Sequence, residues 1–331
     1  MRLKPRLRLF AIRNRVGVNM KKNLLPVICG PTASGKSALA VELARRMGGE
    51  VVSADSMQVY AGLPIGTAVP GEQERRGIPH HLMGFLPLAE SFSVAQYAAL
   101  AHQTIAEIAA RGHQPILCGG TGLYIRAVCE NLQFTEQQTD TAFREAMQRR
   151  AETQGGEILL AELAEIDPET AARLHPRDHK RIIRALEICR LTGGTAAEQL
   201  VYSRSRPSPY DARLIMLDCR DRGLLYRRIG ERADNMIAGG LAGEARMVIE
   251  TETAPTAKQA IGYKELAPWI AGEISREQAA ERLKQETRRY AKRQLTWFRH
   301  MAGVRTLWVE DYDGMEELAG AAMTIIREVR E

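Results

Sequence analysis

The sequence predicts an α/β fold: a doubly wound parallel sheet that carries an all-helical insertion domain and a helical C-terminal part. Three observations predict it. Apolar strand-like segments alternate with helix-like segments over roughly the first 130 residues. One of the turns between them, Gly30–Ser37, matches the phosphate-binding pattern G-x-x-x-x-G-K-[ST]. The strand-like segments stop at about Asn131 and resume at Arg213. We therefore expect a P-loop NTPase-like core interrupted by helices.

The phosphate-binding loop (P-loop, Gly30–Ser37) has the flanks that its pattern requires. An apolar strand is predicted at Leu24–Cys29, and a helix made of strong helix formers is predicted at Ala38–Arg46. A glycine-rich turn at a helix N-terminus directs backbone N–H groups at phosphate oxygens, to which a lysine adds charge and a serine hydroxyl a magnesium ligand. The residues expected to bind a phosphorylated ligand are Gly30, Pro31, Thr32, Ala33, Ser34, Gly35, Lys36 and Ser37, with Ser37 as the metal ligand. The motif alone does not name a reaction.

The next elements predict where this ligand lies. The segments Glu50–Ala54 and Gln114–Cys118 are typical of buried strands, and Ser93–Ala110 has helical periodicity. Ligands of doubly wound sheets bind at the carboxyl ends of the strands. We therefore expect Ser37, Asp55 and Thr121, which lie at or just beyond predicted strand ends, to converge.

The rest of the chain divides the molecule. We expect a core domain formed by residues 23–130 and 211–331, with a helical insertion domain at 131–210. Helices are predicted at Phe143–Leu163 with a break at Gly155-Gly156, at Pro168–Leu174, at Asp178–Leu191 and at Asp221–Ala238. An exit linker is predicted at Ser203–Pro209, strands at Arg213–Asp218 and Val304–Val309, and mainly helix between Gly240 and Ala302.

The charge is unevenly distributed. The net charge is +6, but residues 1–22 hold eight basic side chains and no acid, which leaves 38 basic and 40 acidic side chains elsewhere. Nucleic-acid binding by the folded body must therefore come from local patches. Residues 1–22 form a basic leader that we expect to be disordered or to lie upstream of the true start at Met20, rather than an RNA-binding arm or a transit peptide.

Cysteine usage and hydropathy predict the compartment. The five cysteines are scattered without a C-x-x-C pair, which indicates reduced thiols in a cytoplasmic protein and no metal cluster. No stretch approaches the ~18 apolar residues of a membrane span, so we expect no membrane partner.

Asp55 is the first catalytic candidate after the P-loop. An acid at a strand end beside a P-loop can hold magnesium through water or act as a general base. The alternative is a helix cap, which Asp55-Ser56 would also provide. Its position at the predicted ligand-binding edge favours chemistry.

Two arginines form a second candidate. Arg228 and Arg232 are four residues apart in a predicted helix and therefore share one face, from which they could clamp a polyphosphate. The alternative is a solvated face paired with Glu231 and Asp234.

Two basic clusters are candidates for RNA contacts. The larger one, Lys284–Arg305, interleaves seven cations with Tyr290, Trp297 and Phe298, which suits phosphate contacts and base stacking. The alternative interpretation, without RNA binding, is a charged helix that packs its aromatic side on the core. In Lys180–Arg184 the isoleucines should face the core and the cations point out. His80-His81 lacks a third ligand nearby, which favours a structural role over a metal site.

Taken in order, eight motifs between Leu24 and Arg299 resemble the tRNA dimethylallyltransferases. They are Gly30–Ser37, Asp55–Tyr60, Ile65–Ala68, Pro79–Leu82, Gly119–Tyr124, His175-Pro176 with Arg181 and Arg184, Ile261–Lys264, and Lys292–Arg299. The basic leader departs from the family pattern. The sequence carries no C-terminal zinc-finger pattern of the kind found in some eukaryotic members, so we expect the bacterial type.

The resemblance implies transfer of a dimethylallyl group from dimethylallyl diphosphate to the exocyclic amine of the adenine 3′-adjacent to the anticodon. The tRNAs would be those that read codons beginning with U, and the reaction would be the first step of (methylthio)isopentenyladenosine formation. It also implies Mg²⁺ as cofactor, Asp55 as general base, and Thr32 and Arg232 at the diphosphate, with Arg228 beside them. The chain would act as a monomer whose insertion closes over the anticodon stem-loop. The implied tRNA-contacting residues are Asp55, Ser56, Met57, Gln58, Thr121, Arg144, Lys180, Arg181, Ile182, Ile183, Arg184, Gln259, Gly262, Tyr263, Lys264, Lys292, Arg293 and Arg299.

Three other functions share parts of this pattern. A P-loop kinase needs the same loop and an acid, but leaves the basic aromatic region and the large insertion unexplained. An adenylate isopentenyltransferase shares the chemistry but uses a free nucleotide, which requires no RNA-binding surface. A non-enzymatic RNA-binding protein would use the P-loop as a nucleotide sensor and would not need Asp55.

Overall fold

The computed structural model describes residues 22–134 and 139–328 of the 331-residue chain. The predictions made for residues 1–21 lie outside the described residues.

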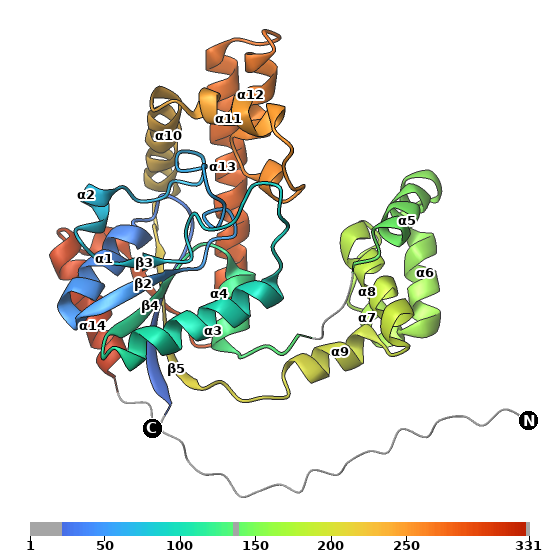
Figure 1. Ribbon diagram of the computed structural model, residues 1–331, viewed down its shortest axis with the longest axis horizontal. Coiled ribbons are helices and arrows are strands. Elements are labelled where there is room, and N and C mark those ends of the chain that lie inside the picture. The colour runs from blue at the N-terminus through green and yellow to red at the C-terminus, as the bar shows by residue number, and fades with distance from the viewer. Residues whose placement is uncertain (1–21, 135–138, 329–331) are drawn as a thin grey trace, which may run out of the picture.

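A six-stranded parallel sheet forms the centre of the molecule (Figure 1). Its strand order is β3-β2-β4-β1-β5-β6, and each neighbouring pair runs parallel. The strands are β1 (Asn23–Cys29), β2 (Gly49–Ser53), β3 (His80–His81), β4 (Gln114–Cys118), β5 (Tyr210–Asp218) and β6 (Arg305–Trp308). The strand that leads into the P-loop, β1, lies centrally between β4 and β5, so the loop emerges at the middle of the carboxyl edge. The predicted α/β fold class is confirmed.

Some of the helices cover both faces of this sheet, and others lie away from it. The described helices are α1 (Lys36–Met47), α2 (Glu72–Arg75), α3 (Val94–Ala110), α4 (Gly122–Cys129), α5 (Thr141–Gln154), α6 (Gly156–Ile166), α7 (Pro168–Ala171), α8 (His179–Thr192), α9 (Ala196–Ser203), α10 (Arg222–Ala238), α11 (Leu241–Glu250), α12 (Tyr263–Ile270), α13 (Arg276–Arg299) and α14 (Met315–Arg327), with short 3₁₀ turns at Ala257–Gln259 and Val309–Asp311.

Alternate residues of β1 show how the two layers are built. Ile28 packs with α1 and α14 on one face, whereas Val27 and Cys29 pack with α3, α4 and α13 on the other. Because both faces are covered, the central strands are apolar almost throughout rather than alternating with polar residues. The apolar residues on both faces of these strands thus explain why helices pack on both sides of the sheet.

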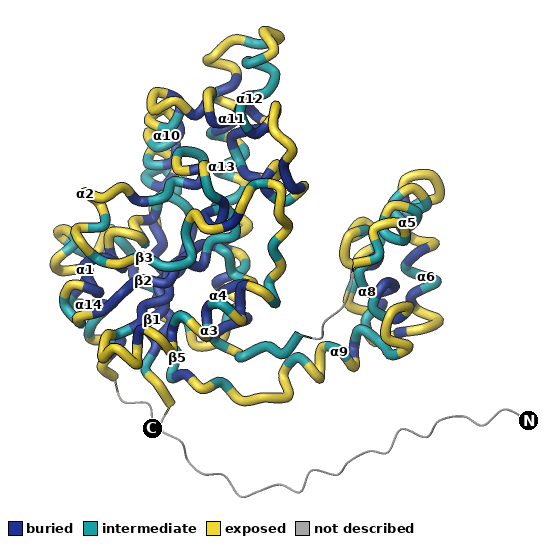
Figure 2. The backbone as a smooth tube through the Cα atoms, in the orientation of Figure 1, coloured by how far each residue is buried: buried dark blue, intermediate teal, exposed yellow. Residues whose placement is uncertain are grey.

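The insertion has a hydrophobic core of its own. Leu159 and Leu163 of α6 pack against Ile182 and Ile183 of α8, with Ala151 of α5 completing the centre. Figure 1 shows α5–α8 as a group apart from the sheet and connected to it through α9, and Figure 2 shows their buried faces turned toward one another. The prediction that the isoleucines of Lys180–Arg184 face this core is confirmed. The exact domain boundaries stay a prediction.

Three elements differ from the sequence analysis. His80-His81 form the edge strand β3, α9 precedes the predicted exit linker and includes its first residue, and the segment after the last predicted strand forms α14. The two histidines pair with Val51 and Val52, but two residues are too few to produce a strand pattern. Helix α14 packs on α1 through its apolar residues Leu318, Ala319 and Ala322. The acidic residues around them masked this apolar face in the sequence.

Candidate active site and RNA-binding surface

The P-loop geometry depends on two glycines. A Cβ at Gly30 would lie 2.4 Å from the carbonyl oxygen of Leu217 in β5, so only glycine fits where the loop leaves β1. Gly35 caps α1 in the left-handed conformation with φ of 92°, which turns the chain into the helix. The N-terminus of α1 therefore faces the carboxyl edge of the sheet, as an anion site requires.

Lys36 is held inside this loop. Its Nζ donates to the carbonyl oxygen of Pro31 at 2.6 Å. Burial, with a smaller contribution from Arg232, lowers the pKa of Lys36 to about 8 against the opposing effects of Cys118, Asp55 and Cys29. A phosphate group at the loop would favour the charged ammonium.

The Asp55 carboxylate is held by the backbone at one oxygen. Its Oδ1 accepts from the main-chain N–H of Met57 at 2.9 Å and of Gln58 at 3.4 Å, which caps the turn that follows β2. No described helix begins at Asp55, so the helix-cap alternative is wrong, whereas the role as a base stays a prediction. Its Oδ2 accepts no hydrogen bond from any described residue. One oxygen is thus fixed by the backbone, and the other is available for a proton.

A cavity of about 320 Å³ joins the P-loop to Asp55. Its polar lining includes Thr32, Lys36, Ser37 and Asp55, so the predicted convergence of Ser37 and Asp55 is confirmed. Thr121 lies beside them, because its Oγ1 accepts from the Ser56 N–H at 2.9 Å.

The two arginines of α10 occupy different places. Arg232 lines the cavity with Asp55, whereas Arg228 lines only a neighbouring cavity on the outer side of the P-loop. Neither forms an ion pair within the described part of the chain, and Asp234 pairs instead with Lys284 at 2.8 Å. Pairing of these arginines with Glu231 and Asp234 is therefore wrong.

The apolar part of the cavity lies between α10 and α13. Ile229, Ala233 and Met236 from α10 face Leu283 from α13, with Ala260 and Ile261 nearby. These positions recur every three or four residues on each helix, so a single face of each is exposed to the cavity. A short branched hydrocarbon suits this end.

Helix α13 packs directly on the Gly119–Gly122 turn. A Cβ at Gly122 would lie 2.0 Å from the Trp297 ring, and one at Gly120 would lie 2.2 Å from Nε2 of Gln294. Gln294 is buried and bonds both to this turn and to the P-loop. Gln294 belongs to the Lys292–Arg299 motif, which the resemblance implied as a tRNA-contacting segment, but nothing in the sequence indicated these two contacts with remote loops.

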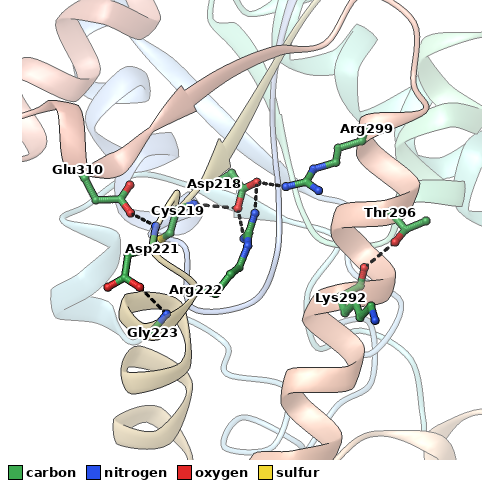
Figure 3. Close-up of polar contacts among 9 residues, drawn as sticks. All are labelled: Asp218, Cys219, Asp221, Arg222, Gly223, Lys292, Thr296, Arg299 and Glu310. Atoms are coloured by element: carbon green, nitrogen blue, oxygen red, sulfur yellow. Dashed lines mark hydrogen bonds and ion pairs between the residues drawn. The ribbon is translucent and has the colours of Figure 1, made fainter.

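A buried carboxylate anchors the end of α13 to the sheet (Figure 3). Asp218, the last residue of β5, accepts from Arg222 at 2.6 Å and from Arg299 at 2.9 Å. Burial alone would raise the pKa of Asp218, but the hydrogen bonds from these two guanidinium groups bring it below its usual value. Arg299, implied as an RNA contact, is thus also a structural anchor.

Most cations of the Lys284–Arg305 cluster have acidic partners. These pairs are Lys284–Asp234, Arg288–Glu281, Arg289–Glu286, Arg299–Asp218 and Arg305–Glu328. Lys292 and Arg293 are exposed and form no ion pair with a described residue, although Arg293 lies over the Tyr290 ring. The aromatic residues split similarly, because Phe298 is in the core while Tyr290 lines the cavity.

A second cavity is lined by more cations than acids, with Glu130 pairing with Arg126 and Arg204. Its cations come from the core helices α4 and α13, from the insertion helix α8 and from the linker after α9, and they are Arg126, Arg181, Arg204, Arg289, Lys292 and Arg293. Arg293 lines both this cavity and the one that holds Asp55. A polyanion bound here would therefore lie next to the reactive cavity.

Several side chains that the resemblance implied as tRNA contacts have structural roles within the protein. Ile182, Ile183 and Tyr263 are buried, and the Tyr263 hydroxyl donates to Glu244 at 2.8 Å. Such residues can offer an RNA only their main chain.

Other implied contacts are held by polar partners. Arg144 and Arg184 both bind the buried carboxylate of Glu187, and Gln58 bonds within its own loop. Lys180 and Arg181 are exposed at the start of α8, and Gln259 and Lys264 line the reactive cavity, whereas Gly262 begins α12.

His80 and His81 have structural roles. His80 Nδ1 lies 2.8 Å from the carbonyl oxygen of Ile78, and His81 Nε2 lies 2.6 Å from the buried carboxylate of Glu50. Among the described residues no group of three or more His, Cys, Asp or Glu side chains is arranged to hold a metal ion. No helix in the described ranges is long and apolar enough to cross a membrane.

Comparison with known proteins identifies the family. The model of the family described as IPP transferase matches residues 58–301. The tRNA dimethylallyltransferase of Caldanaerobacter subterraneus is 45% identical over 295 residues, covering 88% of this chain and 94% of its own. That of Bacillus subtilis is 46% identical over 284 residues, covering 86% and 90%.

Solved structures agree. The tRNA isopentenylpyrophosphate transferase of Bacillus halodurans superposes with a TM-score of 0.68 at 40% identity, over 92% of this chain and 97% of that one. A eukaryotic dimethylallyltransferase acting on tRNA gives a TM-score of 0.77 at 29% identity, over 94% and 81%. The chain therefore belongs to the IPP transferase family, which contains the tRNA dimethylallyltransferases.

Proposed function

We propose that this enzyme is a tRNA dimethylallyltransferase that acts on the adenine 3′-adjacent to the anticodon in tRNAs that read codons beginning with U. The C–O bond of dimethylallyl diphosphate breaks, a C–N bond forms to the exocyclic amine, and the amine loses a proton while diphosphate leaves. The observation that carries the proposal is the single cavity in which the P-loop, Arg232 and Asp55 meet.

The donor fits the two halves of this cavity. The diphosphate would lie at the N-terminus of α1, where Thr32, Lys36 and Arg232 surround it with donors and positive charge. The five-carbon group would extend between the apolar faces of α10 and α13. Stabilising the leaving diphosphate lowers the barrier to breaking the allylic C–O bond.

Asp55 supports the acceptor side of the reaction. An aryl amine is a weak nucleophile because its lone pair is delocalised into the ring, so removing its proton as the bond forms aids attack. Oδ1 is held by the backbone of Met57 and Gln58, which leaves Oδ2 as the proton acceptor. The adenine must leave its stack to reach this oxygen.

The donor set at the P-loop suits Mg²⁺. Ser37 offers one hydroxyl oxygen at the rim of the cavity, and Mg²⁺ commonly takes one or two protein ligands together with phosphate oxygens and water. The ion would neutralise charge that develops on the leaving diphosphate.

The RNA would approach from the positively charged side. Four exposed cations come from the two parts of the molecule. Lys292 and Arg293 belong to the core, whereas Lys180 and Arg181 belong to the insertion. Their charges suit the phosphates of an anticodon stem-loop. A small-molecule kinase would have no use for them.

A single-turnover assay tests the proposal. Enzyme, dimethylallyl diphosphate, Mg²⁺ and an unmodified tRNA that reads a codon beginning with U are mixed, and the nucleosides are analysed by mass spectrometry. We expect one five-carbon unit on the adenine next to the anticodon. Consumption of ATP with a small acceptor, without any gain of mass on the tRNA, would show a kinase instead.

A further inference from the structure

Gln294 connects two loops that the proposed reaction uses but that the chain places far apart. Its Oε1 accepts from the main-chain N–H of Thr32 in the P-loop at 2.9 Å. Its Nε2 donates to the carbonyl oxygen of Gly120 at 2.9 Å. Thr32 is 262 residues away in sequence and Gly120 is 174 residues away.

The two partners fix the orientation of the amide. A backbone N–H needs an acceptor and a backbone carbonyl needs a donor, so only one of the two amide orientations satisfies both. The side chain is also buried, with 6% exposure, and its neighbour Gly120 has no room for a Cβ. A buried amide with both ends satisfied holds its partners at a defined separation.

The contact at Gly120 continues to the general base. Thr121, the next residue, accepts from the Ser56 N–H at 2.9 Å, and Ser56 follows Asp55. A Cβ placed on Gly120 would lie 3.9 Å from Asp55 Oδ2, so the turn also lies beside the reactive oxygen. One amide therefore lies between the loop for the donor and the turn beside the base.

We infer that Gln294 is a positioning residue that keeps the donor-binding P-loop and the Gly120–Thr121 turn beside Asp55 in register for transfer. This inference rests on the proposed function and deepens it. Gln294 does not exchange a proton with either reacting group. Its effect passes through its two hydrogen-bond partners, Thr32 and Gly120. Arg293, the preceding residue of α13, lines both cavities, so RNA bound there contacts the same helical turn.

The first test replaces the amide by an apolar side chain of similar length. We expect Gln294→Met to lower the single-turnover rate at saturating substrates by about tenfold or more, because small displacements of reacting groups cost that much. The dissociation constant for tRNA should stay within about twofold. Gln285→Met is the matched control, since Gln285 is exposed on the same helix and bonds to no described side chain. A Gln294→Met rate within twofold of the wild-type rate would overturn the inference.

A second test works even where Gln294→Met folds poorly. Gly120→Ala places a methyl group 2.2 Å from Nε2 and should displace the amide, whereas the same change in a Gln294→Ala background meets empty space. We expect Gly120→Ala alone to lower the single-turnover rate and to have almost no further effect on it in the Gln294→Ala background, which is a non-additive cycle. If the rate losses of the two substitutions multiply, the two sites act independently, which would contradict the inference. An inactive wild-type enzyme would instead contradict the proposed function.

Discussion

At the scale of single residues, the two oxygens of Asp55 have different surroundings. Oδ1 accepts from the backbone of Met57 and Gln58, which fixes the direction of the carboxylate. Oδ2 accepts no hydrogen bond from a described residue and the side chain lines the cavity, which is the arrangement that the proposed general base requires.

We expect Asp55→Asn to separate binding from chemistry. The amide has the shape of the carboxylate and keeps an acceptor for the Met57 N–H, but it cannot take the amine proton. Transfer should fall by about 10² to 10⁴, measured as the single-turnover rate. The dissociation constant for tRNA, measured by filter binding, should hardly change. Transfer at the wild-type rate would remove Asp55 from the mechanism.

Lys36 makes donor binding depend on pH. Burial lowers its pKa to about 8, so the ammonium that attracts the diphosphate is lost as the pH rises through that value. We expect the affinity for dimethylallyl diphosphate to weaken above pH 8 in calorimetric titrations between pH 6.5 and 9.5. In Lys36→Met the affinity should be lower throughout, and the remaining pH dependence should be that of the ligand. A wild-type profile identical to that of the variant would contradict this role.

The sequence predicts residues whose chemistry is carried by a motif and misses those whose role is to hold others. The P-loop pattern and the acid after β2 predicted that Lys36, Ser37 and Asp55 would lie together, and all three line one cavity, whereas their roles stay predictions. Gln294 and Glu244 were missed because their partners are remote in the chain. Glu244, for example, accepts from the Gly66 N–H at 2.7 Å and from the Tyr263 hydroxyl. No local spacing indicates such a contact.

At the scale of elements, α13 links the sheet, the reactive cavity and the surface proposed to bind RNA. Gln294 and Trp297 contact the Gly119–Gly122 turn, Arg299 binds the end of β5, and Lys292 and Arg293 remain exposed. The basic composition of this helix was visible in the sequence. Which of its cations are paired within the protein could be learned only from the fold.

We expect the anchor at Asp218 to contribute to stability. Asp218→Asn would leave Arg222 and Arg299 without their buried carboxylate, at a cost of about 1–3 kcal/mol, reduced from the value for a fully buried pair because both arginines are partly exposed. Urea denaturation followed by circular dichroism measures it. The exposed Asp313→Asn is the control, and an equal midpoint for both variants would show that the anchor contributes nothing.

Elements with a strong period were predicted well, and short or partner-dependent ones were not. The strands of the central sheet and the helices α3, α8 and α10 follow from periodicity and glycine breaks. Strand β3 exists because β2 offers an unpaired edge, and α14 is stabilised by packing on α1. Those causes lie outside the segments concerned.

At the scale of the whole molecule, the positive charge proposed to bind RNA comes from both the core and the insertion. The folded body has nearly balanced charge, yet cations from α4, α8 and α13 surround one cavity. Of these cations, Lys292 and Arg293 form no ion pair with a described residue, and Arg293 also lines the reactive cavity. Local asymmetry rather than net charge thus suits the molecule to a polyanion.

This arrangement predicts the salt dependence of tRNA binding. Replacing Lys292 and Arg293 by glutamine should weaken binding and lower the slope of log K against log salt by about 1 to 2, since each phosphate contact contributes roughly 0.7 to 0.9. Arg305→Gln is the control, because Arg305 belongs to the same sequence cluster but pairs with Glu328. Equal slopes for both variants would rule out phosphate contacts from Lys292 and Arg293.

The most direct measurement compares two tRNAs that differ by one functional group. In one of them the adenosine 3′-adjacent to the anticodon is replaced by purine riboside, which lacks the exocyclic amine. With labelled dimethylallyl diphosphate in a single turnover, we expect label in the adenosine tRNA and none in the other, although both bind equally. Equal labelling of the two tRNAs would contradict transfer to that amine.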